Sequence, residues 1–195
     1  MNRRSVLSAV LLSAVVVASC GSDGAGHSAS ASTIAISPDA SFNSADVMFA
    51  QGMIPHHEQA IEMADIALDP TVGAGATVTD LASRIKAGQD PEIEQMTTWL
   101  GDWGQPLAMD MSDGHTMAGM EGMLTADELD ALADLRGTEF DRAWMEGMIR
   151  HHEGAIVMAD EVTANGKDAG VRALAAQIIT AQRAEIDEMR ALLGS

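Results

Sequence analysis

Pairs of adjacent histidines occur twice in this chain, within segments that are nearly identical. GMIPHHEQAIEMAD, residues 52–65, returns as GMIRHHEGAIVMAD, residues 147–160, at an offset of 95 residues. Imidazole nitrogens and thioether sulfurs are both copper ligands. On a helix, Met53 shares a face with His56 and His57, three and four residues further on. The spacing therefore predicts a metal site whose ligands come from both copies: His56, His57, His151, His152, Met53, Met63, Met148 and Met158.

A second segment follows each histidine pair and repeats at an offset of 93 residues. Gln89 and Glu92 return as Gln182 and Glu185, in each case within the pattern Gln-x-x-Glu-Ile-x-x-Met. Helical spacing places each glutamate in the middle of an apolar stripe and each glutamine at its edge. Because a carboxylate in such a place needs a partner, we expect these four side chains to be buried polar partners of the histidines.

The elements that position these residues are predicted to be helices, because apolar residues recur at helical spacing through all four segments. In the first helix Gln51 and Glu58 should face away from the buried stripe, and Pro55 should kink or restart the helix, as Pro91 should in the second. Four helices of about 20 residues in two hairpins predict an all-α, up-down bundle. The stripes of the second and fourth helices are Leu81, Ile85, Glu92, Met96, Trp99 and Leu174, Ile178, Glu185, Met189, Leu192.

The connection between the hairpins, residues 101–124, contains a second group of soft ligands among Gly, Asp and Ser: Met109, Met111, His115, Met117, Met120 and Met123. Thioethers with an imidazole suit Cu(I), and imidazole also accepts Cu(II). The connection is therefore either a copper-binding loop or a flexible loop that is merely rich in methionine. Thr125 and Glu128 after it predict the capped start of a short helix that extends to Leu135.

The first 19 residues are predicted to be a lipoprotein signal peptide. Arg3 and Arg4 precede an apolar run over residues 6–18, and small residues lead to Cys20, the only cysteine, as in the lipobox of bacterial lipoproteins. We expect cleavage before Cys20, a lipid on that cysteine, and a flexible spacer over residues 20–43. The chain would then be held on the extracytoplasmic side of the cell membrane. An ordinary secreted protein with a chance cysteine is the alternative.

The composition argues against partners that carry negative charge. The chain has 11 Lys+Arg against 29 Asp+Glu, a net charge of −18, which becomes −20 when Arg3 and Arg4 leave with the signal peptide. Such a surface repels nucleic acid and favours cations. No nucleophile arrangement, phosphate loop or dinucleotide fingerprint stands out, so an enzyme is not predicted.

The doubled GM-I-x-HHE-x-A-I-x-MA pattern, each copy followed by Gln-x-x-Glu-Ile-x-x-Met, resembles the bacterial family labelled domain of unknown function 305. The resemblance extends over residues 44–193. It implies a ferritin-like four-helix bundle over residues 44–195, with repeat one at 44–100, the Met-rich connection at 101–124 and repeat two at 125–195. Since some members are described as periplasmic copper-binding proteins, it also implies copper.

Three functions compete at this point. The first is copper binding, for sequestration or delivery, with a metal-transfer protein or a second copy of the chain as open partners. The second is a di-iron enzyme, which would need Glu-x-x-His on two helices, whereas Met53, Ile54, Met148 and Ile149 occupy the places three residues before the histidines. The third is a buried His/Glu network that fixes the packing of the hairpins and binds no metal.

Overall fold

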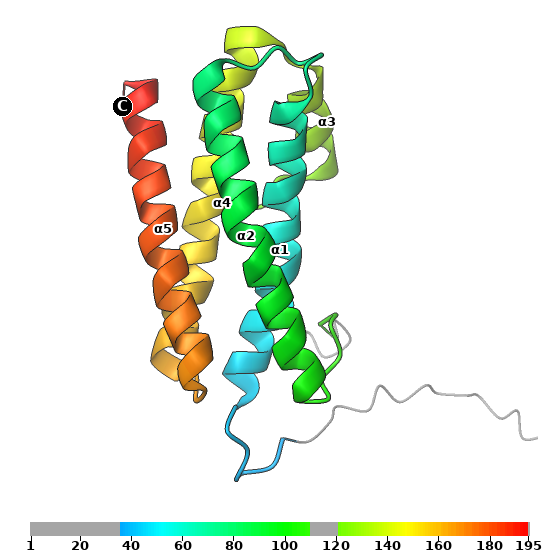
Figure 1. Ribbon diagram of the computed structural model, residues 1–195, viewed down its shortest axis with the longest axis vertical. Coiled ribbons are helices and arrows are strands. Elements are labelled where there is room, and N and C mark those ends of the chain that lie inside the picture. The colour runs from blue at the N-terminus through cyan, green and yellow to red at the C-terminus, as the bar shows by residue number, and fades with distance from the viewer. Residues whose placement is uncertain (1–35, 110–120, 195) are drawn as a thin grey trace, which may run out of the picture. The chain divides into compact units, whose positions relative to one another are not determined.

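The computed structural model describes residues 36–109 and 121–194, and this part of the chain consists of helices and connections without strands. The helices are α1 (Ser44–Leu68), α2 (Ala76–Asp102), α3 (Ala126–Asp134), α4 (Gly137–Asn165) and α5 (Ala169–Leu193) (Figure 1). Four of them are long and form the bundle, and α3 is a short helix on its side. The prediction of an all-α bundle made of two helical hairpins is confirmed.

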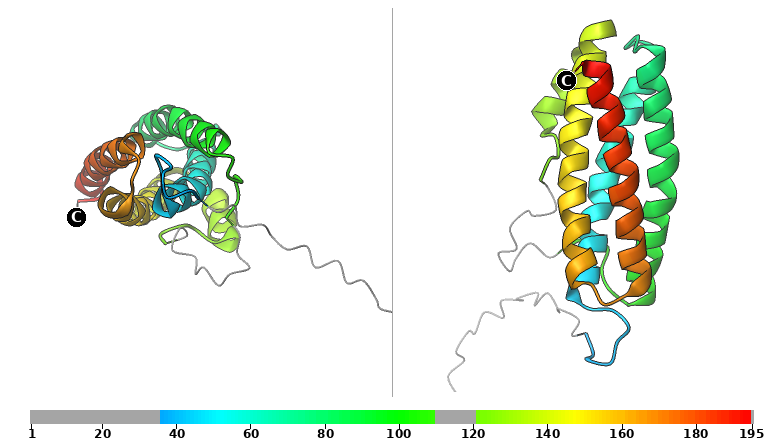
Figure 2. Two further views of the ribbon diagram at one scale, coloured as in Figure 1. Left: turned by 90° about the horizontal axis from the view of Figure 1, so that it is seen from below. Right: turned by 90° about the vertical axis from the view of Figure 1, so that its left-hand side faces the viewer.

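The two hairpins, α1 with α2 and α4 with α5, pack together chiefly through α1 and α4 (Figure 2). The start of α1 and the end of α4 belong to the same core cluster, so these two helices are antiparallel. The four long helices therefore run up, down, down and up. The predicted up-down order holds within each hairpin but is wrong between them, because α2 ends and α4 begins at opposite ends of the bundle. One long crossover of this kind is typical of ferritin-like bundles.

Side-chain caps define where several helices begin. Asn43 caps α1 in a capping box with Asp46, and Thr125 caps α3 in a capping box with Glu128, as the sequence predicts. Helices α1 and α2 continue through Pro55 and Pro91. The expected restart at these prolines is therefore wrong, since the packing of a long amphipathic helix outweighs one missing hydrogen bond.

The core consists of two separate apolar clusters, one toward each end of the bundle. The Phe49 cluster contains the start of α1, the end of α2, the end of α4 and the start of α5. The Trp144 cluster contains the opposite part of each of these helices, together with Leu124 and Leu132. In every long helix, the stretch between the two clusters contains the histidine, glutamine or glutamate residues that recur in the repeat.

Gln51 and Leu192 are among the side chains that lie elsewhere than helical spacing predicted. Gln51 is only 8% exposed, because the connection after α2 covers it and its Nε2 donates to the carbonyl of Pro106 at 2.7 Å. Leu192 is 47% exposed, because Leu193 instead packs against the Trp144 cluster. None of the helices in residues 36–109 and 121–194 is long and apolar enough to cross a membrane.

A reciprocal aspartate contact joins the two hairpins at both ends of the bundle. Buried Asp46, near the start of α1, accepts hydrogen bonds from the backbone N–H groups of Lys167 and Asp168, at 3.0 and 3.1 Å, in the turn between α4 and α5. Asp141, near the start of α4, accepts from the N–H of Gly75, at 2.9 Å, in the turn between α1 and α2. Asp46 and Asp141 are related by the offset of 95 residues. The repeat thus includes the contact that holds its two copies together.

We expect Asp46→Ala to lower the free energy of unfolding by about 3 kcal/mol, because it leaves the N–H groups of Asn43, Lys167 and Asp168 without their charged acceptor. Urea unfolding followed by circular dichroism measures the change. Glu94→Ala removes an exposed carboxylate from α2 and serves as the control. A loss no larger than that of the control would show that the contact does not hold the hairpins together.

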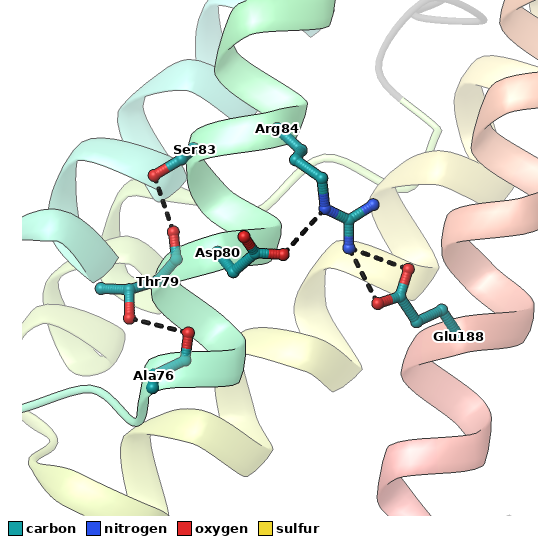
Figure 3. A network of polar contacts seen from close by, with 6 residues as sticks. All are labelled: Ala76, Thr79, Asp80, Ser83, Arg84 and Glu188. Atoms are coloured by element: carbon teal, nitrogen blue, oxygen red, sulfur yellow. Dashed lines mark hydrogen bonds and ion pairs between the residues drawn. The ribbon is translucent and has the colours of Figure 1, made fainter.

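The surface between α2 and α5 is bridged by Arg84, whose guanidinium lies between two carboxylates (Figure 3). It donates to Asp80 on its own helix at 3.0 Å and to both carboxylate oxygens of Glu188 on α5, at 2.8 and 2.9 Å. All three side chains are more than 40% exposed, so solvent screens this bridge and its contribution is about 1 kcal/mol or less. The stability of the bundle therefore depends mainly on its core.

Candidate metal centre

A layer of polar side chains separates the Phe49 cluster from the Trp144 cluster. All four histidines have no exposed surface, and Gln89 and Gln182 are 4% and 3% exposed. Each long helix contributes two members, because the repeat places one pair on α1, α2, α4 and α5 alike. We call this the histidine layer, and its members are His56, His57, Gln89, Glu92, His151, His152, Gln182 and Glu185.

Each repeat contributes one histidine that is hydrogen-bonded to a glutamate of the same hairpin. His57 Nε2 lies 2.8 Å from Glu92 Oε2, and His152 Nε2 lies 2.8 Å from Glu185 Oε2. The two glutamate side chains are 21% and 17% exposed, so they lie at the edge of the layer, whereas Gln89 and Gln182 are buried inside it. The prediction that the glutamates lie in the middle of the buried face and the glutamines at its edge is therefore wrong. In the neutral imidazole, Nε2 donates to the carboxylate and Nδ1 keeps its lone pair. Histidines that bind metals are usually oriented by such a second-shell carboxylate.

The other two histidines meet near the middle of the bundle. The ring centroids of His56 and His151 are 3.9 Å apart, and their planes are inclined by 46°. His56 Nε2 lies 3.2 Å from the backbone carbonyl of Glu121, which can only accept, so Nε2 of His56 carries a proton. Neither ring nitrogen of His151 has a hydrogen-bond partner among the described residues. The two central histidines are therefore in different environments.

Burial keeps both central histidines neutral near pH 7. It lowers the pKa of His56 to about 4, against the opposing effect of the hydrogen bond to Glu121, and His57 and His152 lower it further. Burial also lowers the pKa of His151 well below its usual value, and the neighbouring histidines act in the same direction. A backbone contact with His56 opposes this shift for His151 without reaching hydrogen-bond geometry. Neutral imidazoles are the form that binds metals.

The histidine layer contains most of the unsatisfied buried polar atoms in the described part of the chain. Of nine buried side-chain nitrogen and oxygen atoms without a hydrogen-bond partner, eight belong to this layer. They include Nδ1 of every one of the four histidines, Nε2 of His151, and amide atoms of Gln89 and Gln182. Buried polar groups are normally paired. The layer therefore has unused lone pairs at the place where a ligand could take them up.

The methionines of the two repeats lie on both sides of the histidine layer. Met53 and Met158 belong to the Phe49 cluster, whereas Met63 and Met148 belong to the Trp144 cluster. Met158 is 8% exposed and the other three have no exposed surface. All four predicted thioethers are thus in the core next to the layer, but the same positions also suit ordinary packing.

The structure describes only part of the Met-rich connection. Met109 and Met123 are half-buried residues at its two ends. The other predicted ligands of the connection, Met111, His115, Met117 and Met120, lie outside the described residues, as does Cys20. In residues 36–109 and 121–194, no three His, Cys, Asp or Glu side chains converge on one point as a metal site would require. A metal in the layer would therefore need the soft sulfur ligands, or a small movement of the rings.

Sequence reasoning missed the residues that fix the surroundings of His56. A backbone carbonyl, that of Glu121, makes the hydrogen bond, and no side-chain pattern indicates it. The nearby Gln59 and Gly154 occupy equivalent positions in the two repeats and differ in type. That difference was the available signal, because the surrounding motif is otherwise closely repeated.

The fold is a ferritin-like helical bundle, a class in which metal sites are built from side chains on facing helices. The DUF305 family model (Domain of unknown function) matches residues 46–193, and this chain belongs to that family. The bundle is similar to a DUF305 protein of Streptomyces coelicolor whose name describes it as secreted, with a TM-score of 0.71 and 31% identity over 77% of this chain and 92% of that one.

The bundle is also similar to a protein named CopM, which has been solved with bound copper. Its Cu(II)-bound form gives a TM-score of 0.62 and 35% identity over 75% of this chain and 94% of that one. Its Cu(I)-bound form gives 0.62 and 33% over the same shares, and silver-bound forms are similar too. The uncharacterized protein L153 of Acanthamoeba polyphaga mimivirus is 40% identical over 53 residues, which span 27% of this chain and 35% of that protein.

Proposed function

We propose that this protein binds copper in the histidine layer, for sequestration or delivery outside the cytoplasm. The observation that carries the proposal is the set of four unused Nδ1 atoms in a layer where three of the four histidines already have Nε2 engaged. His57 and His152 donate to glutamates, and His56 donates to a backbone carbonyl. This is the arrangement in which a second-shell acceptor fixes the tautomer and orientation of a metal ligand.

The donor set fits copper better than iron. Neutral imidazoles and thioethers suit copper in both oxidation states, and thioethers favour Cu(I). Both glutamates of the layer are engaged with histidines at 2.8 Å, and no glutamate occupies the Glu-x-x-His place of a di-iron site. Bound copper would supply a soft, redox-active cation, and the chain would hold it through His56, His57, His151 and His152 with help from Met53, Met63, Met148 and Met158. The copper- and silver-bound forms of CopM support the proposal.

A purely structural role for the histidine layer is the second candidate, and the two direct His–Glu hydrogen bonds favour it. A polar network that fixes packing should satisfy its own members. Here eight buried atoms of the layer have no partner among the described residues. We therefore place the structural role second.

The proposal also covers the location of the protein in the cell and the role of the Met-rich connection. We propose that Cys20 carries a lipid that anchors the protein to the extracytoplasmic face of the cell membrane. We also propose that Met109, Met111, His115, Met117, Met120 and Met123 capture Cu(I) before it reaches the core. The name of the similar Streptomyces protein, which describes it as secreted, supports export but not the lipid.

Titration of the purified protein with Cu(I) and Cu(II), followed by metal analysis, tests the proposal. We expect at least one tightly held copper per chain. The double variant His56→Gln, His151→Gln should lower the affinity by roughly 100-fold or more, since second-shell changes alone cost about 10- to 100-fold. A variant of the connection, with Met111, Met117 and Met120 changed to Leu and His115 to Gln, should retain the core copper.

Two results would contradict the proposal. Less than one tightly held copper per chain for both oxidation states would exclude copper binding as the function. If His57→Ala and His152→Ala strongly lower the melting temperature and leave copper affinity unchanged, the layer is structural and any copper binds at the connection.

A further inference from the structure

The last part of the Met-rich connection, residues 121–124, lies against the histidine layer between α1 and α4. The Glu121 carbonyl accepts the hydrogen bond of His56 Nε2 at 3.2 Å. Three residues later, Leu124 is buried in the Trp144 cluster. Its N–H donates to Gln59 Oε1 at 2.7 Å, and its carbonyl accepts from Gln59 Nε2 at 2.8 Å. Residues 121–124, which we call the docked segment, are thus fixed at both ends to side chains of α1.

On the α4 side, the docked segment approaches the helix backbone so closely that two glycines are required. A Cβ at Gly154 would lie 1.8 Å from the Glu121 carbonyl oxygen. A Cβ at Gly122 would lie 2.3 Å from the carbonyl oxygen of Arg150, and Gly122 has φ +82°, which favours glycine. Backbone cannot move aside as a flexible side chain can. Any larger residue at Gly154 must therefore displace the docked segment.

The docked segment makes the two halves of the histidine layer inequivalent. Gln59 and Gly154 are related by the repeat, and so are His56 and His151. Because the segment pairs with Gln59 and occupies the space left by Gly154, it gives a partner to His56 and none to His151. The two central histidines are equivalent in the repeat, but in the structure the ring of His56 is oriented by a hydrogen bond and the ring of His151 has none among the described residues.

We propose that the docked segment is a positioning element of the copper site, with Gln59, Gly122 and Gly154 as the positioning residues that hold it in place. The inference rests on the proposed function. The Glu121 carbonyl holds His56 in the tautomer whose Nδ1 is free to bind, and His151 is left to adjust to the metal. His56 takes part both in the docking of residues 121–124 and in copper binding. Each of these two equilibria is therefore made more favourable by the other, by the same factor.

The test compares two glycine substitutions in the full chain. Gly154→Ala introduces the clash with Glu121, whereas Gly88→Ala, in the middle of α2, meets nothing within 4 Å and is the matched control. Nitrogen-15 NMR of the metal-free protein reports the tautomer of His56. A competition titration with a chromophoric chelator reports the affinity for Cu(I). We expect Gly154→Ala to lose the fixed Nε2–H signal of His56 and to bind Cu(I) roughly 10- to 100-fold more weakly, while Gly88→Ala matches the wild type in both measurements.

A second variant keeps the inference testable if Gly154→Ala does not fold. Gln59→Leu removes both hydrogen bonds to Leu124 without touching a proposed ligand, and we expect the same two changes. If the wild type binds Cu(I) and both variants bind it equally well, the docked segment does not position the site, although the proposed function stands. If the wild type binds no copper, the proposed function fails. The tautomer of His56 in the variants then still shows whether the docked segment orients that ring.

Discussion

Lowering the pH of the metal-free protein from 7 to 5 is expected to reduce its free energy of unfolding by about 2 kcal/mol through His56 alone. The pKa of His56 is about 4 in the folded protein and 6.5 in the unfolded chain. Below pH 6.5 the unfolded chain therefore takes up a proton that the folded protein does not, and stability falls until the pH reaches about 4. The pKa of His151 is shifted in the same direction, so this residue adds to the loss.

Urea unfolding at pH 7, 6 and 5, in the presence of a chelator, measures this dependence. Acid also relieves repulsion among the carboxylates, so the informative quantity is the stability of the wild type minus that of His56→Gln at each pH. We expect this difference to shrink as the pH falls. A difference that stays constant would mean that His56 titrates alike in both states, and imidazole NMR signals that shift near pH 6.5 would say the same.

Glu92→Gln combined with Glu185→Gln is expected to weaken copper binding by roughly 100-fold, and each single change by about 10-fold. Each glutamate accepts from a histidine Nε2 at 2.8 Å, so the loss of its charge lowers the basicity of the ring without removing a ligand. Competition titrations with Cu(I) and Cu(II) measure the affinities.

The exposed Glu94, two residues after Glu92, provides the control. Glu94→Gln changes the net charge by the same amount as either single variant and should leave the affinity unchanged. If the double variant binds copper as tightly as the wild type, the carboxylates of Glu92 and Glu185 do not influence His57 and His152 as copper ligands. If each single variant and the control weaken binding equally, only the overall charge matters.

Much of the fold follows from the sequence because its signals are local. Helical spacing and the repeat predict four long helices, and the Thr125 cap predicts the short one. The order of the helices could not be predicted in this way, since it depends on which ends of the hairpins meet. That choice is made by contacts distant in sequence, such as Asp46 with the turn at Lys167. Neither Asp46 nor Asp141 carries a local sign of this role.

The candidate site was predictable to a similar degree. Residue type and helical phase indicate that each glutamate is a partner of the histidines, and the structure places His57 beside Glu92 and His152 beside Glu185. For the asymmetry of His56 and His151, the two nearly identical motifs give one signal, the difference between Gln59 and Gly154, and that signal does not say what the asymmetry is. The asymmetry comes from a backbone carbonyl and from the absence of a side chain at Gly154. A backbone carbonyl and a glycine without a side chain produce no periodic pattern of residue types in the sequence.

The reciprocal contacts of Asp46 and Asp141 imply that one hairpin already contains both halves of its own interface. Each hairpin has the aspartate that binds a turn and the turn that receives an aspartate. Two identical hairpins could therefore associate as a symmetric dimer, with every such contact made twice and a central histidine from each copy. Fusion of two such genes would give the present chain. The linker that joins the two hairpins contains residues 121–124, which make the two copies inequivalent.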